Sequence, residues 1–580
     1  MKTQFLLLLI LFLAVGLISV HAQQSVPMAS PSPPAQEPKT PPATPQKNLP
    51  DLSRVGIDTG SNQPLSLREA LSMALANNKD IEVARHNVKI AEFDFLGAKG
   101  AYDPKLSSFA YYERVKTPIT SFLTGGSNGA VTQTDYTANV RLEGLSKFGG
   151  NYHLDFSSIR LTSDNSFTAL SPQYPTALTF TYTQPLIRGL RIDNSRRQIE
   201  ITRKSLSLTD AQFRQRTIET ITNVQRAYWD LVFALRNLQI QRTAVGDARS
   251  QLEHNRRLVT EGQLAPIDLV ASESQVAGYE QSMYGALEEV SRSENLLKNL
   301  IAENREAPIW TVSIVPTDSV NVTVPTIALP EAINVALENR PELQQSNVAR
   351  EINEIDQSYY RDQTKPEVDL TGSYGVVGTA GTSNSLGTNP FTASSQQVRD
   401  RVDLLSALNG LPPLPVVPPQ TITPQLIGGY GQSLQNLFGN EFNNFRVGIQ
   451  INLPLRNRTA EAQLGRSLVE GERIKTQRQQ LEQAIQVDVR NSLQSVRSAE
   501  ARLRAAAVAR DTSERQYQSE QRKLDAGQST VFLVLQRQTE MTTARGNELR
   551  AQTDLNKSIA DLHRATGNAL QANSIVVRTR

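Results

Sequence analysis

Cysteine is absent from this chain of 580 residues. Its absence excludes disulfide bonds, thiolate metal ligands, thiol nucleophiles and a lipid-modified N-terminal cysteine. An excess of one charge sign is also lacking, because 60 lysines and arginines face 57 acidic residues and leave a formal net charge of +3. This balance lacks the excess of basic residues that is typical of nucleic-acid-binding proteins.

Histidine is scarce and scattered. No two of the five histidines have a metal-ligand spacing with nearby carboxylates; they are His21, His86, His153, His254 and His563. The chain also has no glycine-rich phosphate loop and no nucleophile elbow. We therefore expect no enzyme, no cofactor and no metal site.

The start of the chain has the pattern of an export signal. A positively charged start precedes an apolar stretch over residues 5–20, and Val20 and Ala22 suit the small-residue positions of a cleavage site. We expect a signal peptide over residues 1–22. An uncleaved anchor helix is the alternative.

A proline-rich segment follows the signal. Residues 25–50 contain nine prolines among polar and small residues, a composition that favours extended chain and cannot bury a core. We expect residues 23–63 to form a disordered linker. No run of 18 apolar residues occurs after it, so no transmembrane helix is expected.

The rest of the chain is an internal duplication. The segment from Leu65 aligns without gaps to the segment from Ile327, at a constant offset of 262 residues. A repeat of this length indicates that each half folds as a copy of the same unit. The first-half members of the ten identical pairs are Leu67, Glu69, Ala70, Ala74, Leu75, Asn77, Ile90, Glu92, Asp94 and Pro104. The expected divisions are residues 64–310, a connecting segment 311–326, residues 327–570 and a C-terminal tail 571–580.

Each half contains a segment in which apolar and polar residues alternate, at residues 104–186 and 366–454. In the clearest stretch, five apolar residues (Phe445, Val447, Ile449, Ile451, Leu453) alternate with polar or small ones. One apolar and one polar face over about ten residues is typical of strands in an outer-membrane barrel. A soluble β-sandwich alternates similarly, so the strands alone leave both folds open.

Very long helices favour the first of these folds. No glycine or proline occurs between Leu190 and Val245 or between Glu472 and Ala526. A helix from Leu190 to Val259 is roughly 105 Å long at 1.5 Å per residue, which no globular core requires. A coiled-coil seam with three-four spacing follows Ile221, Val224, Tyr228, Leu231, Leu235, Leu238, Arg242, Val245, Arg249, Leu252, Arg256 and Val259.

Three arginines stand in the second part of this seam. Arg242, Arg249 and Arg256 occupy every other seam position. Their long side chains either lie along the seam with their charged heads in water, or form a basic strip that faces a lumen or a docking helix.

Each long helix is interrupted by a Gly-Gln pair. Gly262 and Gly527 suit the left-handed conformation that ends a helix, and Pro266 suits the first turn of the next one. A second helical stretch follows each pair and must return along the first. We therefore expect helical hairpins over residues 187–303 and 455–567 with tips near the two glycines. A kink inside one continuous helix is the alternative.

This order of elements, repeated twice, resembles the TolC-like outer membrane efflux protein family. The resemblance covers roughly residues 64–570. It rests on the repeat starts at 67–78 and 329–339, Gln184-Pro185-Leu186 and Leu453-Pro454-Leu455 before the long helices, and the two tips. It implies a membrane α+β fold, in which a trimer shares an outer-membrane β-barrel and extends a long periplasmic α-helical coiled-coil barrel.

The resemblance also implies a function. A homotrimer would form the passive exit duct of a tripartite efflux or type I secretion system, in the cell outer membrane and spanning into the periplasm. A periplasmic adaptor protein would link its tips to an inner-membrane pump or an ABC-type secretion transporter. One copy has too few strands for a wide barrel, and an open edge cannot lie in lipid. The alternative is a periplasmic or surface coiled-coil protein without a pore.

The resemblance places adaptor docking and the gate at the tips. Asp268 matches an acidic residue that family members have six positions after the tip glycine, but Leu533 stands there in the second half, and Gln536 follows where the family often has an acid. Ser529 replaces an arginine that can lock the closed tip. One hypothesis is that Asp268 pairs with Arg522 or Lys523 instead. The residues assigned to docking and gating are Gly262, Gln263, Asp268, Leu269, Gly527, Gln528, Ser529, Leu533 and Val534.

Three further segments have expected roles. Residues 137–162 resemble an extra hairpin that turns near Lys147–Gly150 and either joins the barrel or projects from it. Residues 379–440 are expected to form a long extracellular loop that plugs or shields the mouth. Residues 311–325 are expected to form a belt around the middle of the tunnel.

Overall fold

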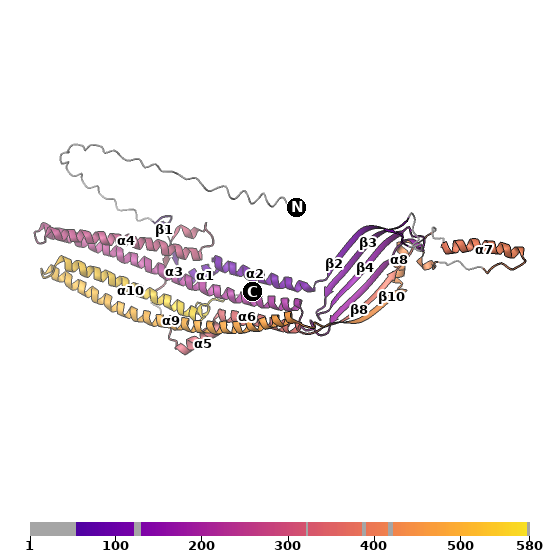
Figure 1. Ribbon diagram of the computed structural model, residues 1–580. Helices are drawn as coiled ribbons and strands as arrows, with labels where there is room; N and C mark the ends of the chain where they lie inside the picture. The colour runs from indigo at the N-terminus through magenta and orange to yellow at the C-terminus, as the bar shows by residue number, and fades with distance from the viewer. Residues whose placement is uncertain (1–53, 121–128, 321–322, 385–389, 416–421, 577–580) are drawn as a thin grey trace, which may run out of the picture. The chain divides into compact units, whose positions relative to one another are not determined.

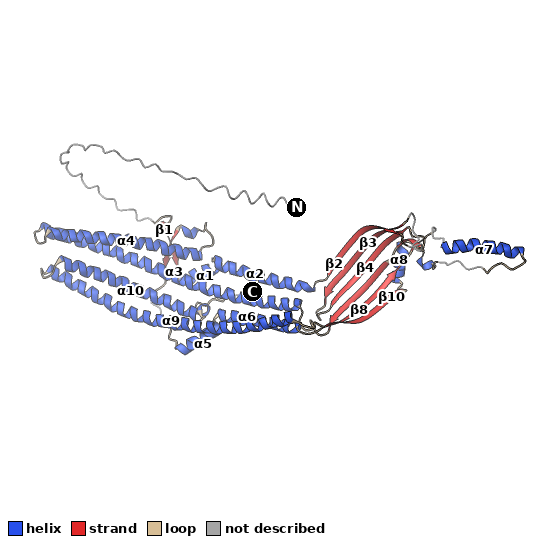
Figure 2. Cartoon of the chain, in the orientation of Figure 1, coloured by secondary structure: helices blue, strands red, loops and turns tan. Residues whose placement is uncertain are grey.

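The computed structural model describes residues 54–120, 129–320, 323–384, 390–415 and 422–576. The expected signal peptide and the linker up to residue 53 lie outside these ranges. The described chain combines an antiparallel sheet with long helices that run beside one another (Figures 1 and 2). Within these ranges, no helix has the length and apolar character needed to span a bilayer.

Each repeat begins with a pair of helices. In the first repeat these are α1 (Leu67–Asn77) and α2 (Lys79–Lys99), followed by the short turn η1 (Gly100–Tyr102). Ser66 and Glu69 form a reciprocal capping box at the start of α1. The side chain of Asn78 accepts from two backbone amides at the start of α2 and donates to the carbonyl of Leu300. Asn78 therefore both breaks the helix and ties it to the end of the first hairpin.

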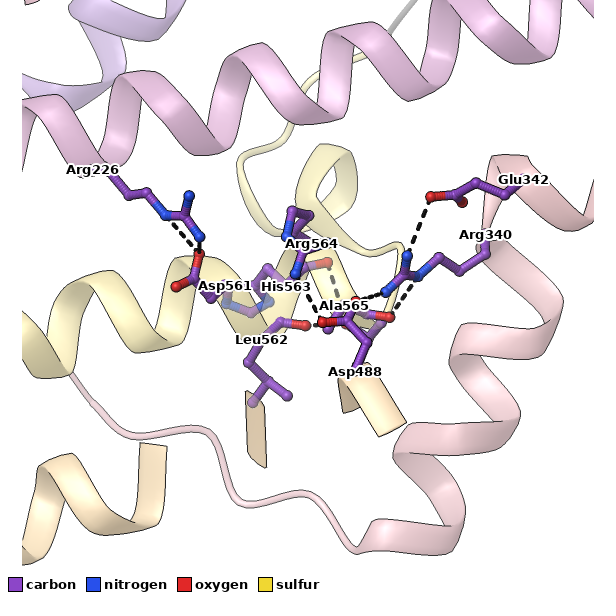
Figure 3. A network of polar contacts seen from close by, with 10 residues as sticks. Arg226, Arg340, Glu342, Asp488, Asp561, Leu562, His563, Arg564 and Ala565 are labelled. Carbon is purple, nitrogen blue, oxygen red and sulfur yellow. Dashed lines mark hydrogen bonds and ion pairs between the residues drawn. The ribbon is translucent and has the colours of Figure 1, made fainter. Parts of the chain in front are cut away.

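The second repeat has the same arrangement with a charged residue at the break. Arg340 separates α5 (Leu329–Asn339) from α6 (Pro341–Gln363), and its Nε donates to the carbonyl of Ala565 at 2.9 Å. Arg340 also pairs with Asp488, which accepts from Arg564 at 3.0 Å (Figure 3). This network joins three helices at one point.

Two helical hairpins follow the paired helices. The first consists of α3 (Asn194–Thr260) and α4 (Pro266–Ile301), and the second of α9 (Arg458–Asp525) and α10 (Val531–Ala565). The long members have 67 and 68 residues, which is about 100 Å of helix each. The short helix α11 (Ala569–Ala572) ends the described fold.

The seam inside the first hairpin differs from the predicted one beyond Val245. Tyr228, Leu231 and Val245 are buried as expected, but farther along the buried residues of α3 are Ala248, Gln251 and Asn255. These three residues each stand one position before a predicted seam residue, so the contact line departs from the strict heptad spacing there. Arg249 and Arg256 are consequently exposed beside the seam rather than in it.

A small parallel sheet corrects the expected linker and belt. Strand β1 (Asp58–Leu65) pairs with β7 (Val312–Pro316), which follows the turn η2 (Pro308–Trp310). Residues 58–63 are therefore ordered structure rather than linker. Among the described residues of the expected belt, Val312–Pro316 form a strand.

An ion-pair cluster holds this small sheet against α4. Arg54 binds Glu294 at 2.5 Å, and Glu294 also accepts from the backbone of Ile314 at 2.7 Å. Lys298 donates to the carbonyl of Val312 at 2.7 Å. Burial outweighs the neighbouring Glu294 and lowers the pKa of Lys298. Partners far apart in sequence provide these contacts, so local composition did not reveal them.

The large sheet is an antiparallel meander in the order β10-β8-β6-β4-β3-β2. Its strands are β2 (Lys105–Pro118), β3 (Ala130–Leu145), β4 (Asn151–Ser163), β6 (Thr176–Pro185), β8 (Glu367–Gly378) and β10 (Phe442–Asn452), with the short β5 (Leu170–Gln173) and β9 (Gly381–Ser383) beside them. The extra hairpin is β3 and β4, which pair in continuous register with β2 and β6. It is part of the sheet.

The segment 379–440 contains helices as well as loop. These are α7 (Pro390–Leu408), the turn η3 (Pro424–Leu426) and α8 (Tyr430–Phe438). Helix α8 packs on β6 and β8, where the hydroxyls of Thr176 and Ser433 lie 2.9 Å apart. A Cβ at Gly378 would stand 2.0 Å from the carbonyl oxygen of Ser433, so only glycine permits this approach.

We predict that Asp488→Asn weakens the junction drawn in Figure 3. Burial raises the pKa of Asp488, but the hydrogen bonds from Arg564 and Arg340 outweigh it and hold the pKa below its usual value. The stabilisation is therefore present above about pH 4 and is lost as pH falls through the folded-state pKa. Asp488→Asn should lower the free energy of unfolding by about 1.5–3 kcal/mol at neutral pH.

Denaturant unfolding followed by helical circular dichroism measures this difference. The control is Asp511→Asn, because Asp511 forms an exposed pair with Arg515 at 2.9 Å on one helix and should change stability by less than about 0.5 kcal/mol. Equal losses in both variants, or a loss at Asp488 that is the same at pH 3 and pH 7, would contradict the prediction.

Candidate functional site

The large sheet has one apolar and one polar face. Paired residues of neighbouring strands share a face, so the pairings assign every strand residue to one side. The apolar face carries Leu106, Ala138, Val140, Leu142, Leu154, Phe156, Leu178, Phe180, Leu370, Val376, Phe445, Val447, Ile449 and Ile451. The polar face carries Lys105, Asn139, Arg141, Glu143, His153, Asp155, Thr181, Asp369, Thr371 and Arg446. Such a sheet suits lipid on one side and water on the other.

Aromatic residues gather where the apolar face ends. Tyr112 and Tyr136 pack with ring centroids 5.0 Å apart, and the guanidinium of Arg160 lies over Tyr136 at 5.9 Å. Tyr174 and Tyr430 line the same shallow recess. Tyrosine with a neighbouring cation is typical of the level at which a membrane protein meets lipid headgroups.

Helix α8 lies on the apolar side of the sheet. Thr176, which contacts it, shares its face with Leu178 and Phe180. A helix on this face cannot fill the space in front of the polar face. Of the two roles left open for residues 379–440, plugging the mouth does not fit the position of α8.

Both outer strands of the sheet have an open edge. Every residue of β2 and β10 is exposed, and each of these strands has one partner strand among the described residues. Unpaired backbone N–H and C=O groups cost several kcal/mol each in hydrocarbon. The sheet cannot lie in lipid as a single copy.

The two hairpin tips have the same backbone geometry. Gly262 adopts φ +73°; its N–H donates to Val259 at 3.1 Å, and the N–H of Gln263 donates to Leu258 at 2.9 Å. Gly527 adopts φ +75°, with the matching bonds from Gly527 to Leu524 and from Gln528 to Lys523. This is the Schellman ending of a helix, which requires a left-handed residue and therefore favours glycine.

The first tip has an uncharged polar interior. Asn255, fully buried, accepts from Gln251 and donates to Ser272, both at 2.8 Å. Ser272 donates in turn to the backbone carbonyl of Asp268 at 3.0 Å. These bonds tie the two helices together just before the turn.

The second tip has charged residues at the corresponding places, 265 residues further on. Glu520 matches Asn255 and accepts a hydrogen bond from the hydroxyl of Ser529. It also pairs with Lys523 at 3.3 Å. The hydrogen bond from Ser529, followed by that from Lys523, lowers the pKa of Glu520. Ser529 thus takes part in closing its own hairpin.

The hypothesis that Asp268 pairs with Arg522 or Lys523 is wrong within one copy of the chain. Lys523 pairs with Glu520, and Arg522 donates to the carbonyl of Gln518 on its own helix at 3.2 Å. The described residues contain no ion pair of Asp268 with either cation.

The other predicted tip residues fall into two groups. Gly262, Gln263, Gly527, Gln528 and Leu533 are exposed, whereas Asp268, Leu269 and Ser529 are half-buried. Val534 is fully buried in the hairpin. Val534 therefore supports the tip from inside and offers no surface to a partner.

The sequence reasoning missed two exposed apolar residues at the tips. Ile267 is 71% exposed and Phe532 is 67% exposed. They stand 265 residues apart, five positions after each tip glycine, so aligning the two Gly-Gln pairs would have revealed them. Both repeats therefore expose a bulky apolar residue at the same place of the tip.

Polar contacts connect the two hairpins along their length. Near the tips, Gln275 donates to the carbonyl of Leu535 at 3.1 Å. Farther along, Lys557 pairs with Asp230 at 2.7 Å, and Arg226 pairs with Asp561 (Figure 3). Burial lowers the pKa of Lys557, but its hydrogen bond to Asp230 and the charges of Asp230 and Asp554 together outweigh burial and raise that pKa. Charged pairs at an interface between hairpins set their register.

The three predicted strip arginines are exposed on α3. Arg249 pairs across the hairpin with Glu280 at 2.5 Å, and Arg256 pairs along its own helix with Glu253 at 3.3 Å. Arg242 makes no ion pair with the described residues.

We predict that Gly262→Val and Gly527→Val loosen the tips without disturbing the rest of the fold. An added Cβ would meet nothing within 4 Å at either glycine, so the effect is conformational and amounts to roughly 1–2 kcal/mol. Limited proteolysis should cut each variant faster at its tip.

Two controls separate backbone strain from added bulk. Gly262→Asn keeps a residue that tolerates the left-handed conformation, and Gly278→Val adds the same side chain to open space on α4. Tips of Gly262→Val and Gly527→Val that resist protease as well as these controls do would show that the glycines are not required.

The chain matches known proteins in sequence pattern and in fold. The family model of the outer membrane efflux protein matches residues 70–303 and 422–568. Among curated proteins none matches the chain. Solved structures of the outer-membrane channel OprN and of Campylobacter jejuni CmeC each have a TM-score of 0.59 and 14% identity. The match to OprN covers 91% of this chain and 98% of the OprN chain. The match to CmeC covers 90% of this chain and 94% of the CmeC chain.

The outer membrane channel MtrE of Neisseria gonorrhoeae is similar as well, with a TM-score of 0.55, 15% identity, and coverage of 87% of this chain and 89% of its own. Identities this low show a common fold, while the family model covers well over half of the sequence. The two-faced sheet, the duplicated hairpins and the sequence pattern agree, and the chain belongs to the outer membrane efflux protein family.

Proposed function

We propose that this protein is the outer-membrane component of a tripartite efflux or type I secretion system and acts as its passive exit duct. As a member of the efflux family, it is an outer-membrane channel that extends into the periplasm. In the proposal, three identical copies form the channel. The observation that supports this proposal is the sheet. Its apolar face suits lipid, its polar face suits water, and its open edges need further strands to pair with.

The long hairpins would extend the water-filled path from the membrane towards the inner membrane. Helices α3 and α9 are each about 100 Å long by their residue counts. They start directly after β6 and β10, so the polar path continues from the sheet into the helices. Water-filled passage through such a tunnel requires no chemistry from the protein, and transport energy would come from an inner-membrane pump or an ABC-type transporter.

A periplasmic adaptor protein would bind the hairpin tips. Helices α3 and α9 begin after the strands and end at the tips, so the tips are at the ends of these helices away from the sheet. Each tip exposes one large apolar residue, Ile267 or Phe532. Apolar residues within a polar rim are the usual anchors of a protein interface. The tip residues Gln263 and Gln528, also exposed, would provide that rim.

The assembly itself is the first test. The mature protein, purified in mild detergent, should have the mass of three chains, and negative-stain images should show a hollow cylinder with a tunnel of roughly 100 Å, as the helix lengths require. A monomer, or a particle without a hollow axis, would refute the duct. That outcome would favour a coiled-coil protein of the periplasm or cell surface without a pore.

We predict that Ile267→Ser together with Phe532→Ser abolishes export while leaving the trimer intact. Both side chains are mostly exposed, so their removal should change stability by less than about 0.5 kcal/mol. Export should fall because the anchors of the adaptor contact are lost. Val508→Ser, at a residue of α9 that is 68% exposed, is the matched control. Unchanged export by the double variant would place docking elsewhere.

A further inference from the structure

We propose that β2 of one copy pairs with β10 of the next, so that three copies close a barrel of 18 strands in which the extra hairpin of β3 and β4 is part of the wall. The inference rests on the homotrimer of the proposed function. It adds the number of strands, the strand pairing between copies and the width of the pore.

The two open edges are complementary in direction. Strand β2 begins at Lys105, after the helices of its repeat, and runs away from them, whereas β10 runs back and ends at Asn452 before α9. An even number of strands in an antiparallel meander gives edges that run in opposite directions. A second copy can therefore add its β2 to β10 as a regular antiparallel pair.

The faces of the two edges also agree. On β10 the residues Phe445, Val447 and Ile449 are apolar and more than half exposed. On β2 the matching face carries Leu106, Ala110 and Tyr112. When antiparallel pairing places apolar residues of the two strands opposite each other, the apolar face of one copy continues into that of the next. A slip by one residue would place every apolar side chain on the wrong side.

The stagger of the strands gives the tilt that a barrel needs. A row of paired residues crosses the sheet through Lys105, Glu143, His153, Thr181, Ser373 and Arg446. Lys105 is the first residue of β2, but β10 continues from Arg446 to Asn452, six residues farther towards the helices. Six residues at ~3.3 Å over five strand spacings of ~4.8 Å correspond to a tilt of about 40°, within the 35–45° of closed barrels.

This stagger also predicts the register between copies. If the same stagger continues from β10 to β2 of the next copy, Lys105 of that copy lies opposite the position six or eight residues after Arg446. Only even numbers are allowed, because an odd shift would place the apolar residues of the two strands on opposite faces. Val447 then lies opposite Ala110 of the next copy in the first register, or opposite Tyr112 in the second.

The width of such a barrel matches the helices below it. At each level of the hairpins four helices of a copy lie side by side, α2-α3-α6-α9 near the sheet and α4-α3-α10-α9 near the tips. A ring of twelve helices at 8–10 Å spacing is roughly 31–39 Å across between helix axes. Eighteen strands at the tilt above give roughly 34–39 Å, and twelve strands only roughly 23–26 Å.

The hairpin therefore widens the membrane pore to the width of the tunnel. If β3 and β4 projected from the barrel and β2 paired with β6, the wall would narrow at the membrane. With them in the wall, Asn139, Arg141 and Asp155 face the lumen. The ligand class that fits is large hydrated cargo, because polar groups line a pore that does not narrow at the lipid.

Cysteine cross-linking tests the strand pairing directly, since the chain has no cysteine of its own. Full-length protein carrying Val447→Cys with Ala110→Cys, or Val447→Cys with Tyr112→Cys, is oxidised in isolated outer membranes and run on a non-reducing gel. One of the two pairs should move most of the chain to bands of two and three times its mass. Reduction should restore the single band.

Two further pairs control the experiment. Val447→Cys with Gly372→Cys lies across the observed β10-β8 pairing and should form a disulfide within one copy, without dimer or trimer bands. Gly448→Cys with Ala110→Cys places the two thiols on opposite faces and should not cross-link. The first control shows that the cysteine on β10 can form a disulfide. The second shows that cross-linking requires both thiols on the same face of the sheet.

The outcomes distinguish the inference from the function on which it rests. A trimeric hollow cylinder without cross-linking of either pair overturns the strand pairing but not the duct. A trimer whose barrel, imaged along its axis, measures roughly 23–26 Å overturns the 18-strand wall. Cross-linked bands with a barrel of roughly 34–39 Å support it, whereas a protein that stays monomeric refutes the proposed function itself.

Discussion

The need to pair backbone groups at the sheet edges in lipid decides how this chain assembles. Strands β2 and β10 leave one side of each unpaired, and hydrocarbon offers no water to replace the missing partners. Soluble proteins protect such edges with charges or covering elements, whereas here the edges are long and carry alternating apolar residues. A closed barrel removes the edges, so association and membrane insertion become one requirement. The copy number then follows from how many strands each chain supplies.

The long helices are stabilised by contacts of a different kind. A rod of about 100 Å cannot bury itself in one core, so its stability comes from a succession of small contacts along the hairpins. Apolar clusters alternate with polar joints, such as the junction of Asp488 with its two arginines and the pairs between Lys557 and Asp230. Apolar clusters alone would let one hairpin slide along the other. The directed polar bonds fix the register of the tips relative to the sheet.

Much of the fold could be predicted because its signals are local. The repeat, the strand alternation and the tip glycines each depend on residues close in sequence, and the two tips adopt the left-handed conformation that Gly262 and Gly527 suggested. What failed depends on distant partners. The seam departs from heptad spacing after Val245, β1 pairs with a strand some 250 residues away, and Lys523 prefers Glu520 to Asp268. Whether the extra hairpin joined the sheet was likewise a question of pairing between strands, which composition cannot answer.

The two halves of the duplication have diverged where each has a separate task. The first repeat supplies four long strands of the described sheet and the second supplies two, so the wall is widened from one half only. At the tips the divergence is chemical, with Asn255 and Ser272 in the first half and Glu520 and Ser529 in the second. Six tips in a trimer would therefore alternate between neutral and charged interiors. In the proposed docking, a partner that binds all six tips would meet two kinds of site with an apolar residue at the same position. That residue would carry the common contact, and the polar surroundings would distinguish the sites.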